Sequence, residues 1–169
     1  MLLFLVASAL SLSAAESTNR LGFPASGFSI APLEFSPGTT ACQALMMFLP
    51  PSGGFAGNVN VQIQPYNGTI SEYTTLSLKQ FKDAGLKLIA QKKAGASGVI
   101  FEYSGELRGK SLHWYARSEK MADHVYLVTA TADEQDWPKQ AAQLKSCVDS
   151  FRCESGDATS ELKSAKPQK

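Results

Sequence analysis

The sequence predicts an α+β domain in which helices pack on a largely antiparallel sheet as an α/β/α sandwich. Three observations support this fold class. Four β-rich segments follow one another through short polar loops, as in an antiparallel meander. An amphipathic helix pattern comes after them. An earlier segment is apolar at odd and even positions alike, which is typical of a strand that is covered on both faces.

Size and charge narrow the possible functions. The chain has 169 residues, of which 44% are hydrophobic and 18% charged, so it fits one globular domain. Lys and Arg total 16, Asp and Glu total 15, and the net charge is +1. A balance this close to neutral argues against a nucleic-acid-binding protein or a polybasic membrane binder.

The first 15 residues resemble an export signal. They carry no charged side chain, and the apolar run LLFLVASALSL is too short to span a bilayer as a helix. Ser13 and Ala15 supply small residues at the −3 and −1 positions of a cleavage site. We therefore expect residues 1–15 to be a signal peptide, with a mature periplasmic or secreted protein that begins near Glu16. A buried N-terminal helix is the rival interpretation. Residues 16–27 are expected to be a linker.

Three strands are predicted before the first helix. Phe28–Ile30 is a short strand closed by a proline. Residues 42–49, CQALMMFL, are apolar at odd and even positions alike, so both faces of this strand are expected to be buried. Residues 58–64 alternate strictly, with Val and Ile on one face and amide side chains on the other.

The middle of the chain predicts one helix and then the meander. Residues 74–84 have a narrow apolar stripe, and Gly85 suits the position that ends a helix. Strands are expected at residues 86–92, 98–105, 110–117 and 124–131, since each is β-rich and bounded by small or polar residues.

A second helix is predicted at the end of the domain. Five apolar residues recur at spacings of four and three and line one helical face: Trp137, Ala141, Leu144, Val148 and Phe151. Asp136 is the expected N-cap, and Pro138 fits the first turn. The single domain is expected to cover residues 28–152. The polar segment 153–169 has the composition of a disordered tail.

Several strings in this domain suggest a family. They are GVIFEYSGEL from Gly98, LHWYAR from Leu112, HVYLVTATADEQDW from His124 and VDSFR from Val148. With the order of elements, they resemble the PsbP-like or Mog-like fold family, which includes DcrB-type bacterial envelope proteins. The resemblance implies an antiparallel sheet with packed helices and a non-enzymatic or accessory role. It implies no catalytic residue.

One polar cluster is the candidate site. Glu102, His113, Tyr115 and Arg117 are expected on one sheet face, if the hairpin register brings Glu102 near His113. A Glu–His pair could act as a base or bind a ligand. A cross-strand polar pair with a structural role explains the same residues and is the preferred interpretation.

Three cysteines fit an oxidising compartment with one disulfide and one free thiol. A Cys147–Cys153 bridge is the preferred pairing and requires the last helix to stop before Cys153. Pairing of Cys42 with either partner remains open. No C-x-x-C is present, so neither a metal nor a cofactor is expected. Asn67 begins a glycosylation sequon that also reads as a turn.

These observations predict an exported, non-catalytic domain that binds a protein partner or supports an envelope assembly. No nucleic acid, transmembrane segment or catalytic residue is expected. The alternative is a small-ligand-binding protein or an unrecognised enzyme with a polar pocket near Glu102, His113 and Tyr115.

Overall fold

The computed structural model describes residues 21–23, 27–30 and 41–153. The predicted signal peptide, most of the linker and nearly all of the predicted tail lie outside these residues.

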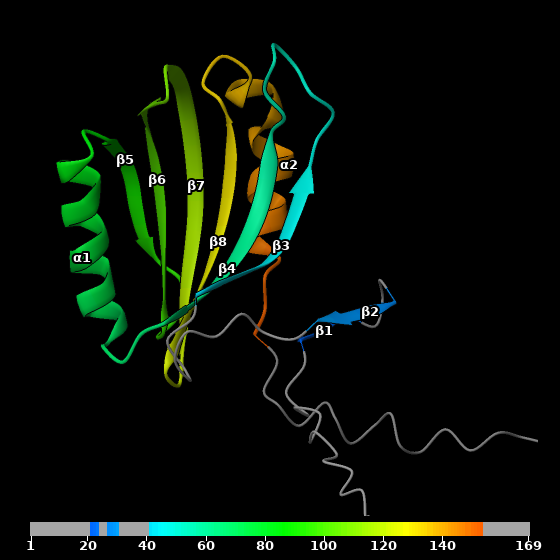
Figure 1. The fold of residues 1–169 in the computed structure, drawn as a ribbon. Coiled ribbons are helices and arrows are strands. Elements are labelled where there is room, and N and C mark those ends of the chain that lie inside the picture. Colours follow the sequence, from blue (N-terminus) through cyan, green and yellow to red (C-terminus); the bar gives the residue numbers. More distant parts are fainter. Residues whose placement is uncertain (1–20, 24–26, 31–40, 154–169) are drawn as a thin grey trace, which may run out of the picture.

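The described domain is built on a six-stranded antiparallel sheet (Figure 1). Its strands are β3 (Cys42–Phe48), β4 (Asn58–Pro65), β5 (Lys87–Lys93), β6 (Gly98–Leu107), β7 (Lys110–Met121) and β8 (His124–Asp133). Their order is β3-β4-β8-β7-β6-β5. The predicted α+β class and the meander from β5 to β8 are confirmed. β1 (Leu21–Phe23) and β2 (Phe28–Ile30) form a separate two-stranded sheet.

The β6–β7 hairpin turns through two residues with left-handed backbone. Arg108 has φ 53° and Gly109 has φ 75°, the combination that suits a two-residue hairpin loop. Both strands are longer than predicted. Backbone pairing continues past residue 105 to Leu107 in β6 and past residue 117 to Met121 in β7. The resulting register places Glu102 directly opposite Tyr115.

Helix α1 (Ile70–Asp83) begins four residues before the predicted start at residue 74. Thr69 and Glu72 form a capping box, in which each side chain accepts a hydrogen bond from the other residue's backbone N–H. This box defines the first turn independently of the apolar stripe. Gly85 follows the helix with φ 68°, as predicted for the residue that ends it.

Helix α2 (Trp137–Asp149) buries the predicted residues Trp137, Leu144 and Val148. The predicted capping role of Asp136 is wrong. This residue occupies the N-cap position with helical backbone angles, and its side chain makes no capping hydrogen bond. An N-cap side chain ordinarily reaches the first turn from extended backbone, which Asp136 does not adopt.

The two helices contact different residues of the sheet. Ile100 belongs to the core cluster that includes Leu144 of α2. Its neighbour Phe101 packs edge-on against Phe81 of α1, with ring centroids 5.3 Å apart. Adjacent residues on a strand point to opposite faces. We call the face with Ile100 the α2 face and the face with Phe101 the α1 face.

The predicted burial of residues 42–49 is wrong. Met46 and Met47 are 41% and 42% exposed, and Phe48 is 63% exposed. β3 is apolar on both sides but lies at the edge of the sheet, beside β4 alone. Burial of both faces would require packed elements above and below this edge.

Within the described residues, no helix has the length and apolar character needed to cross a membrane.

Candidate functional site

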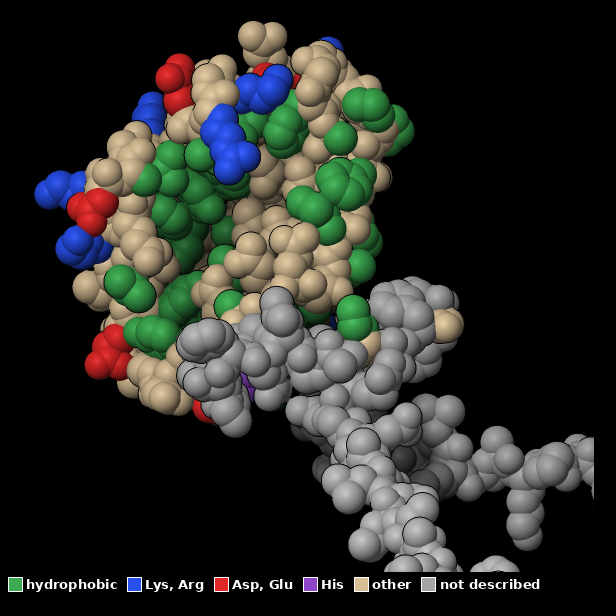
Figure 2. All heavy atoms as spheres, in the orientation of Figure 1, with side chains coloured by type: hydrophobic (Ala, Val, Ile, Leu, Met, Phe, Trp, Pro, Cys, Tyr) green, Lys and Arg blue, Asp and Glu red, His purple; other side chains and the backbone are tan. Residues whose placement is uncertain are grey.

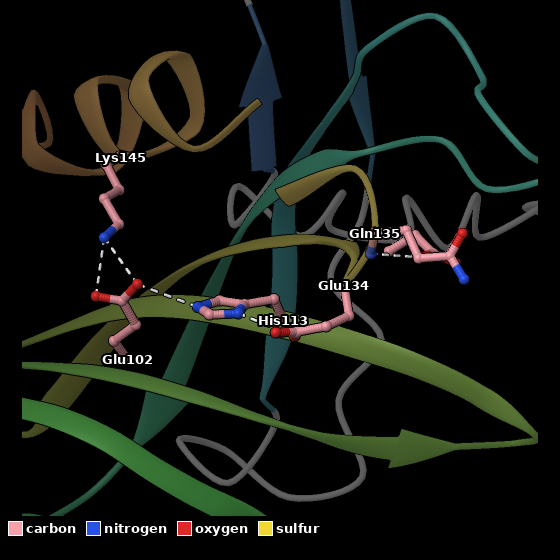
Figure 3. A network of polar contacts seen from close by, with 6 residues as sticks. Glu102, His113, Glu134, Gln135 and Lys145 are labelled. Carbon is pink, nitrogen blue, oxygen red and sulfur yellow. Dashed lines mark hydrogen bonds and ion pairs between the residues drawn. The ribbon is translucent and has the colours of Figure 1, made fainter. Parts of the chain in front are cut away.

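A network of polar side chains lies between the sheet and α2, and His113 is at its centre (Figure 3). Its Nε2 is 3.1 Å from Oε1 of Glu102 on β6, and its Nδ1 is 3.0 Å from Oε2 of Glu134. The hairpin register pairs His113 with Ser104, so Glu102 is two residues from the position opposite. A diagonal cross-strand contact of this kind is within reach of long side chains.

The His113 ring is enclosed as well as hydrogen-bonded. The residue is 5% exposed, and the imidazole stacks on the indole of Trp137 with ring centroids 4.0 Å apart. Each ring nitrogen also has a carboxylate oxygen within hydrogen-bond distance.

Glu102 connects the sheet to α2. Nζ of Lys145 lies 2.7 Å and 2.8 Å from its two carboxylate oxygens. Burial acts to raise the pKa of Glu102, but hydrogen bonds from Lys145 and His113 outweigh burial, so the pKa is lowered. Glu102 is therefore held as a carboxylate by two neighbouring donors.

The other two predicted residues make different pairs. The Tyr115 hydroxyl donates to Oδ1 of Asp149 at 2.9 Å, and burial is the main cause of the raised pKa of Tyr115. Arg117 donates to Glu119 Oε2 from Nε at 3.0 Å and from Nη2 at 2.6 Å. The structure thus brings Glu102 and His113 into direct contact, and it gives Tyr115 and Arg117 other carboxylate partners.

A small cavity of about 210 Å³ opens beside this network. Its lining residues come from three strands and α2: Ala90, Lys92, Ile100, Glu102, Tyr115, Lys145 and Asp149. Nζ of Lys145 lies 5.1 Å from the centroid of the Tyr115 ring, and Nζ of Lys92 lies 5.7 Å from it, both within cation–π range. The cavity therefore has two cations and two carboxylates around one aromatic ring.

Sequence reasoning missed the partners on other elements. Lys145 and Asp149 are four residues apart on α2, a spacing that places them on one side of the helix, and Lys145 follows the buried Leu144. This spacing could have predicted that Lys145 and Asp149 face the sheet together. Glu134 lies beyond β8, in the connection to α2, and nothing in its local sequence indicated His113 as its partner.

The predicted Cys147–Cys153 disulfide is not formed, and Cys42, Cys147 and Cys153 are all unpaired. α2 does stop before Cys153, as the bridge requires. However, Cys147 packs against the core cluster, whereas Glu119 and Arg117 of β7 influence the pKa of Cys153. The two thiols therefore have different surroundings on either side of the helix end.

Metal-ligating side chains do not gather in groups of three or more within the described part of the chain.

Comparisons with known proteins identify a shared fold. No family model matches the chain, and a search of curated proteins found no match. Among solved structures, the chain is similar to PA94 of Pseudomonas aeruginosa, a protein of unknown function. The TM-score is 0.61 at 15% identity, and the match covers 81% of this chain and 97% of PA94.

Two further solved structures are similar at lower scores. Cyanobacterial PsbP (CyanoP) from Synechocystis sp. PCC 6803 has a TM-score of 0.46 at 14% identity, covering 88% of this chain and 99% of CyanoP. LpqN of Mycobacterium tuberculosis, which is involved in cell envelope biogenesis, has a TM-score of 0.41 at 12% identity. The match covers 69% of this chain and 84% of LpqN. The chain thus shares the fold of PA94, and a PsbP protein is among its structural neighbours.

Proposed function

We propose that this chain is an exported, non-catalytic PsbP-like domain that binds a protein partner along the edge strand β3. The observation that carries the proposal is the exposed apolar surface of this strand. Leu45, Met46, Met47 and Phe48 are each more than two-fifths exposed and follow one another without interruption. Exposed apolar patches on soluble domains commonly mark interaction sites.

The two edges of the sheet differ in charge. The sequence of β5, KLIAQKK, places Lys87, Lys92 and Lys93 along its edge. Lysine on an edge strand discourages pairing with another chain. The sequence of β3, CQALMMF, contains no charged residue. Among the described strands, only β4 pairs with β3, so its outer edge offers backbone groups without such protection.

A groove beside β3 adds a place for a partner's side chain. This cavity of about 210 Å³ lies between the strand and α2, and it includes Met47, Val59 and Leu144 in its lining. None of the described residues that line it is charged. We infer that the partner adds an extended segment to β3 and places an apolar side chain in this groove, as in other cases of β-strand addition.

The polar network supports a structural role for the predicted site. Glu102 contacts Lys145 and His113, and His113 also contacts Glu134. These groups satisfy one another and join α2 to the sheet. The positions of α1 and α2 on the two defined faces also support the predicted α/β/α sandwich.

A matched pair of variants tests partner binding. Met47→Lys places a charge on β3, and Leu107→Lys places one at a distant site that is 52% exposed. Wild-type and variant proteins are used for quantitative affinity capture from the native envelope or culture fluid. A partner retained by wild type and Leu107→Lys but lost from Met47→Lys is the expected result. Equal capture by both variants would contradict binding at β3.

The second candidate function is binding of a small polar molecule in the cavity beside Glu102 and Tyr115. The cavity itself favours this alternative, because it lies where the sequence predicted a polar pocket. Saturable shifts of the Glu102 and Tyr115 amide signals during a metabolite titration would support it. The mutual pairing of the charged groups makes it the weaker candidate.

A further inference from the structure

A second groove lies on the α1 face, away from both sites described above. It is a cavity of about 220 Å³ between α1 and the sheet. Tyr73, Leu76 and Phe81 of α1 contribute one wall, and residues of β6, β7 and β8 contribute the floor. Figure 2 shows hydrophobic side chains along a hollow beside α1 on this face. The described residues that line the groove carry no acidic or basic side chain.

The floor of this groove contains a buried hydroxyl with no partner. Ser118 is 1% exposed, and its Oγ makes no hydrogen bond within the described part of the chain. On the neighbouring strands, Val99 and Leu127 lie opposite this residue, and neither side chain can hydrogen-bond. Leaving a buried hydroxyl unpaired is unfavourable.

The neighbouring Tyr73 hydroxyl donates its own proton elsewhere. The Tyr73 hydroxyl donates to Oε1 of Gln64 at 2.8 Å. Burial raises the pKa of Tyr73, and the Ser118 hydroxyl is close enough to oppose that rise, without meeting hydrogen-bond geometry. The Ser118 O–H can approach the Tyr73 hydroxyl, so the Ser118 oxygen is the group left to accept a hydrogen bond from whatever enters the groove.

Size and lining define the class of occupant. An apolar cavity of about 150 Å³ is enough to hold benzene, so the volume here suits a substituted or fused ring. The rings of Phe81 and Tyr103 stack with centroids 4.2 Å apart, and Phe101 packs against Phe81. Such surfaces favour contact with another ring. An ionised ligand would lose its hydration with no opposite charge in the lining to compensate.

We propose that the groove between α1 and the sheet binds a small uncharged ring compound, whose single hydrogen-bonding group pairs with the Ser118 hydroxyl. This site goes beyond the proposed function, because it uses the α1 face and neither β3 nor the groove beside α2.

The probes are 1-naphthol and naphthalene, which have the same fused rings and differ by one hydroxyl. Titration of the isotope-labelled protein with 1-naphthol should give saturable amide shifts centred on Ala116, Ser118 and Leu127. Ser118→Ala should weaken 1-naphthol binding by roughly 3- to 10-fold, because one hydrogen bond is lost. The same variant should bind naphthalene as tightly as wild type does.

Ser111→Ala is the matched control, because Ser111 is an exposed serine on the same strand. It should bind both probes as wild type does. Should Ser118→Ala fail to fold, Leu76→Lys tests the same site from the exposed rim, where Leu76 is 42% exposed. That variant should weaken both probes, since it removes apolar contact and adds a charge.

Three results would overturn the proposal: no saturable binding of 1-naphthol, shifts centred elsewhere, or equal affinity of wild type and Ser118→Ala for 1-naphthol. Equal affinity would mean that a water molecule, and not the ligand, hydrogen-bonds to the Ser118 hydroxyl. Met47→Lys should leave 1-naphthol binding unchanged, so failure of this proposal is distinguishable from failure of partner binding at β3.

Discussion

The imidazole of His113 lies almost flat against the indole of Trp137, with ring planes 15° apart. Trp137 is the first residue of α2, and the same imidazole contacts Glu102 on β6 and Glu134 in the connection to α2. One side chain on β7 therefore contacts three other parts of the fold. This arrangement supports the structural role proposed for the buried imidazole.

We expect His113→Gln to lower the free energy of unfolding by roughly 1–3 kcal/mol, because it removes the ring stack on Trp137 and the contacts of the imidazole with Glu102 and Glu134. Urea denaturation monitored by circular dichroism measures the loss. His124→Gln is the matched control, since the His124 side chain is 34% exposed and hydrogen-bonds to the exposed Asp123. Its cost should stay within about 0.5 kcal/mol. Equal effects of the two substitutions would argue against a structural role for His113.

Acid should weaken the fold partly through Glu102. The pKa of Glu102 is lowered in the folded protein, so its ionised form stabilises the fold above the unfolded value of about 4.3. This contribution is lost as pH falls through the lower folded value. Denaturation midpoints measured from pH 6 downward should therefore decline more steeply in wild type than in Glu102→Gln. Parallel curves for the two proteins would contradict the role assigned to the ion pair with Lys145.

How much the sequence predicted depended on whether the signal was local. β-rich composition bounded by small or polar residues found the strands of the meander, and the spacing from Trp137 to Val148 found α2. The contact between Glu102 and His113 followed from adjacent strands joined by a tight turn. In each case, the interacting residues lie on one element or on consecutive elements.

The missed start of α1 and the capping role assigned to Asp136 were local failures, whereas the other failures came from tertiary placement. The apolar run in β3 is compatible with a central strand or with an edge strand that exposes apolar side chains. Only the strand order distinguishes the two. Lys145 reaches Glu102 because α2 crosses the sheet at that point, a contact between residues 43 positions apart. The cysteine pairing depended on the direction of the chain after α2, which local periodicity does not encode.

Exposure of β3 makes a direct prediction about stability. Met47→Asp should lower the free energy of unfolding by less than about 1 kcal/mol, because the side chain is 42% exposed and the charge stays hydrated. Ala130→Asp is the contrasting variant, since Ala130 is fully buried in the α2-face core. An unpaired charge there should prevent folding or cost several kcal/mol. A severe effect of Met47→Asp on the isolated domain would show that β3 is covered.

Export makes a prediction about the N-terminus. The uncharged run in residues 1–15 and the small residues Ser13 and Ala15 predict cleavage before Glu16. Intact-mass analysis of protein from the native host should therefore show a chain that begins at or near Glu16. Replacement of Ala15 by a bulky residue such as Phe should block processing and leave the precursor mass. An intact Met1 on wild-type protein outside the cytoplasm would contradict signal cleavage.

The last prediction concerns the thiols. Peptide mapping without reduction should find no Cys147–Cys153 link, because all three cysteines are unpaired. Burial, with a further contribution from Glu119, raises the pKa of Cys153. A raised pKa leaves less thiolate at neutral pH, and the thiolate is the form that reacts. In the native protein, alkylation of Cys153 by iodoacetamide should therefore be slower than alkylation of glutathione and should accelerate as pH rises. In urea, where the local environment is lost, the rate should approach that of glutathione. A Cys147–Cys153 peptide in the unreduced digest would show that the chain after α2 can fold back onto the helix.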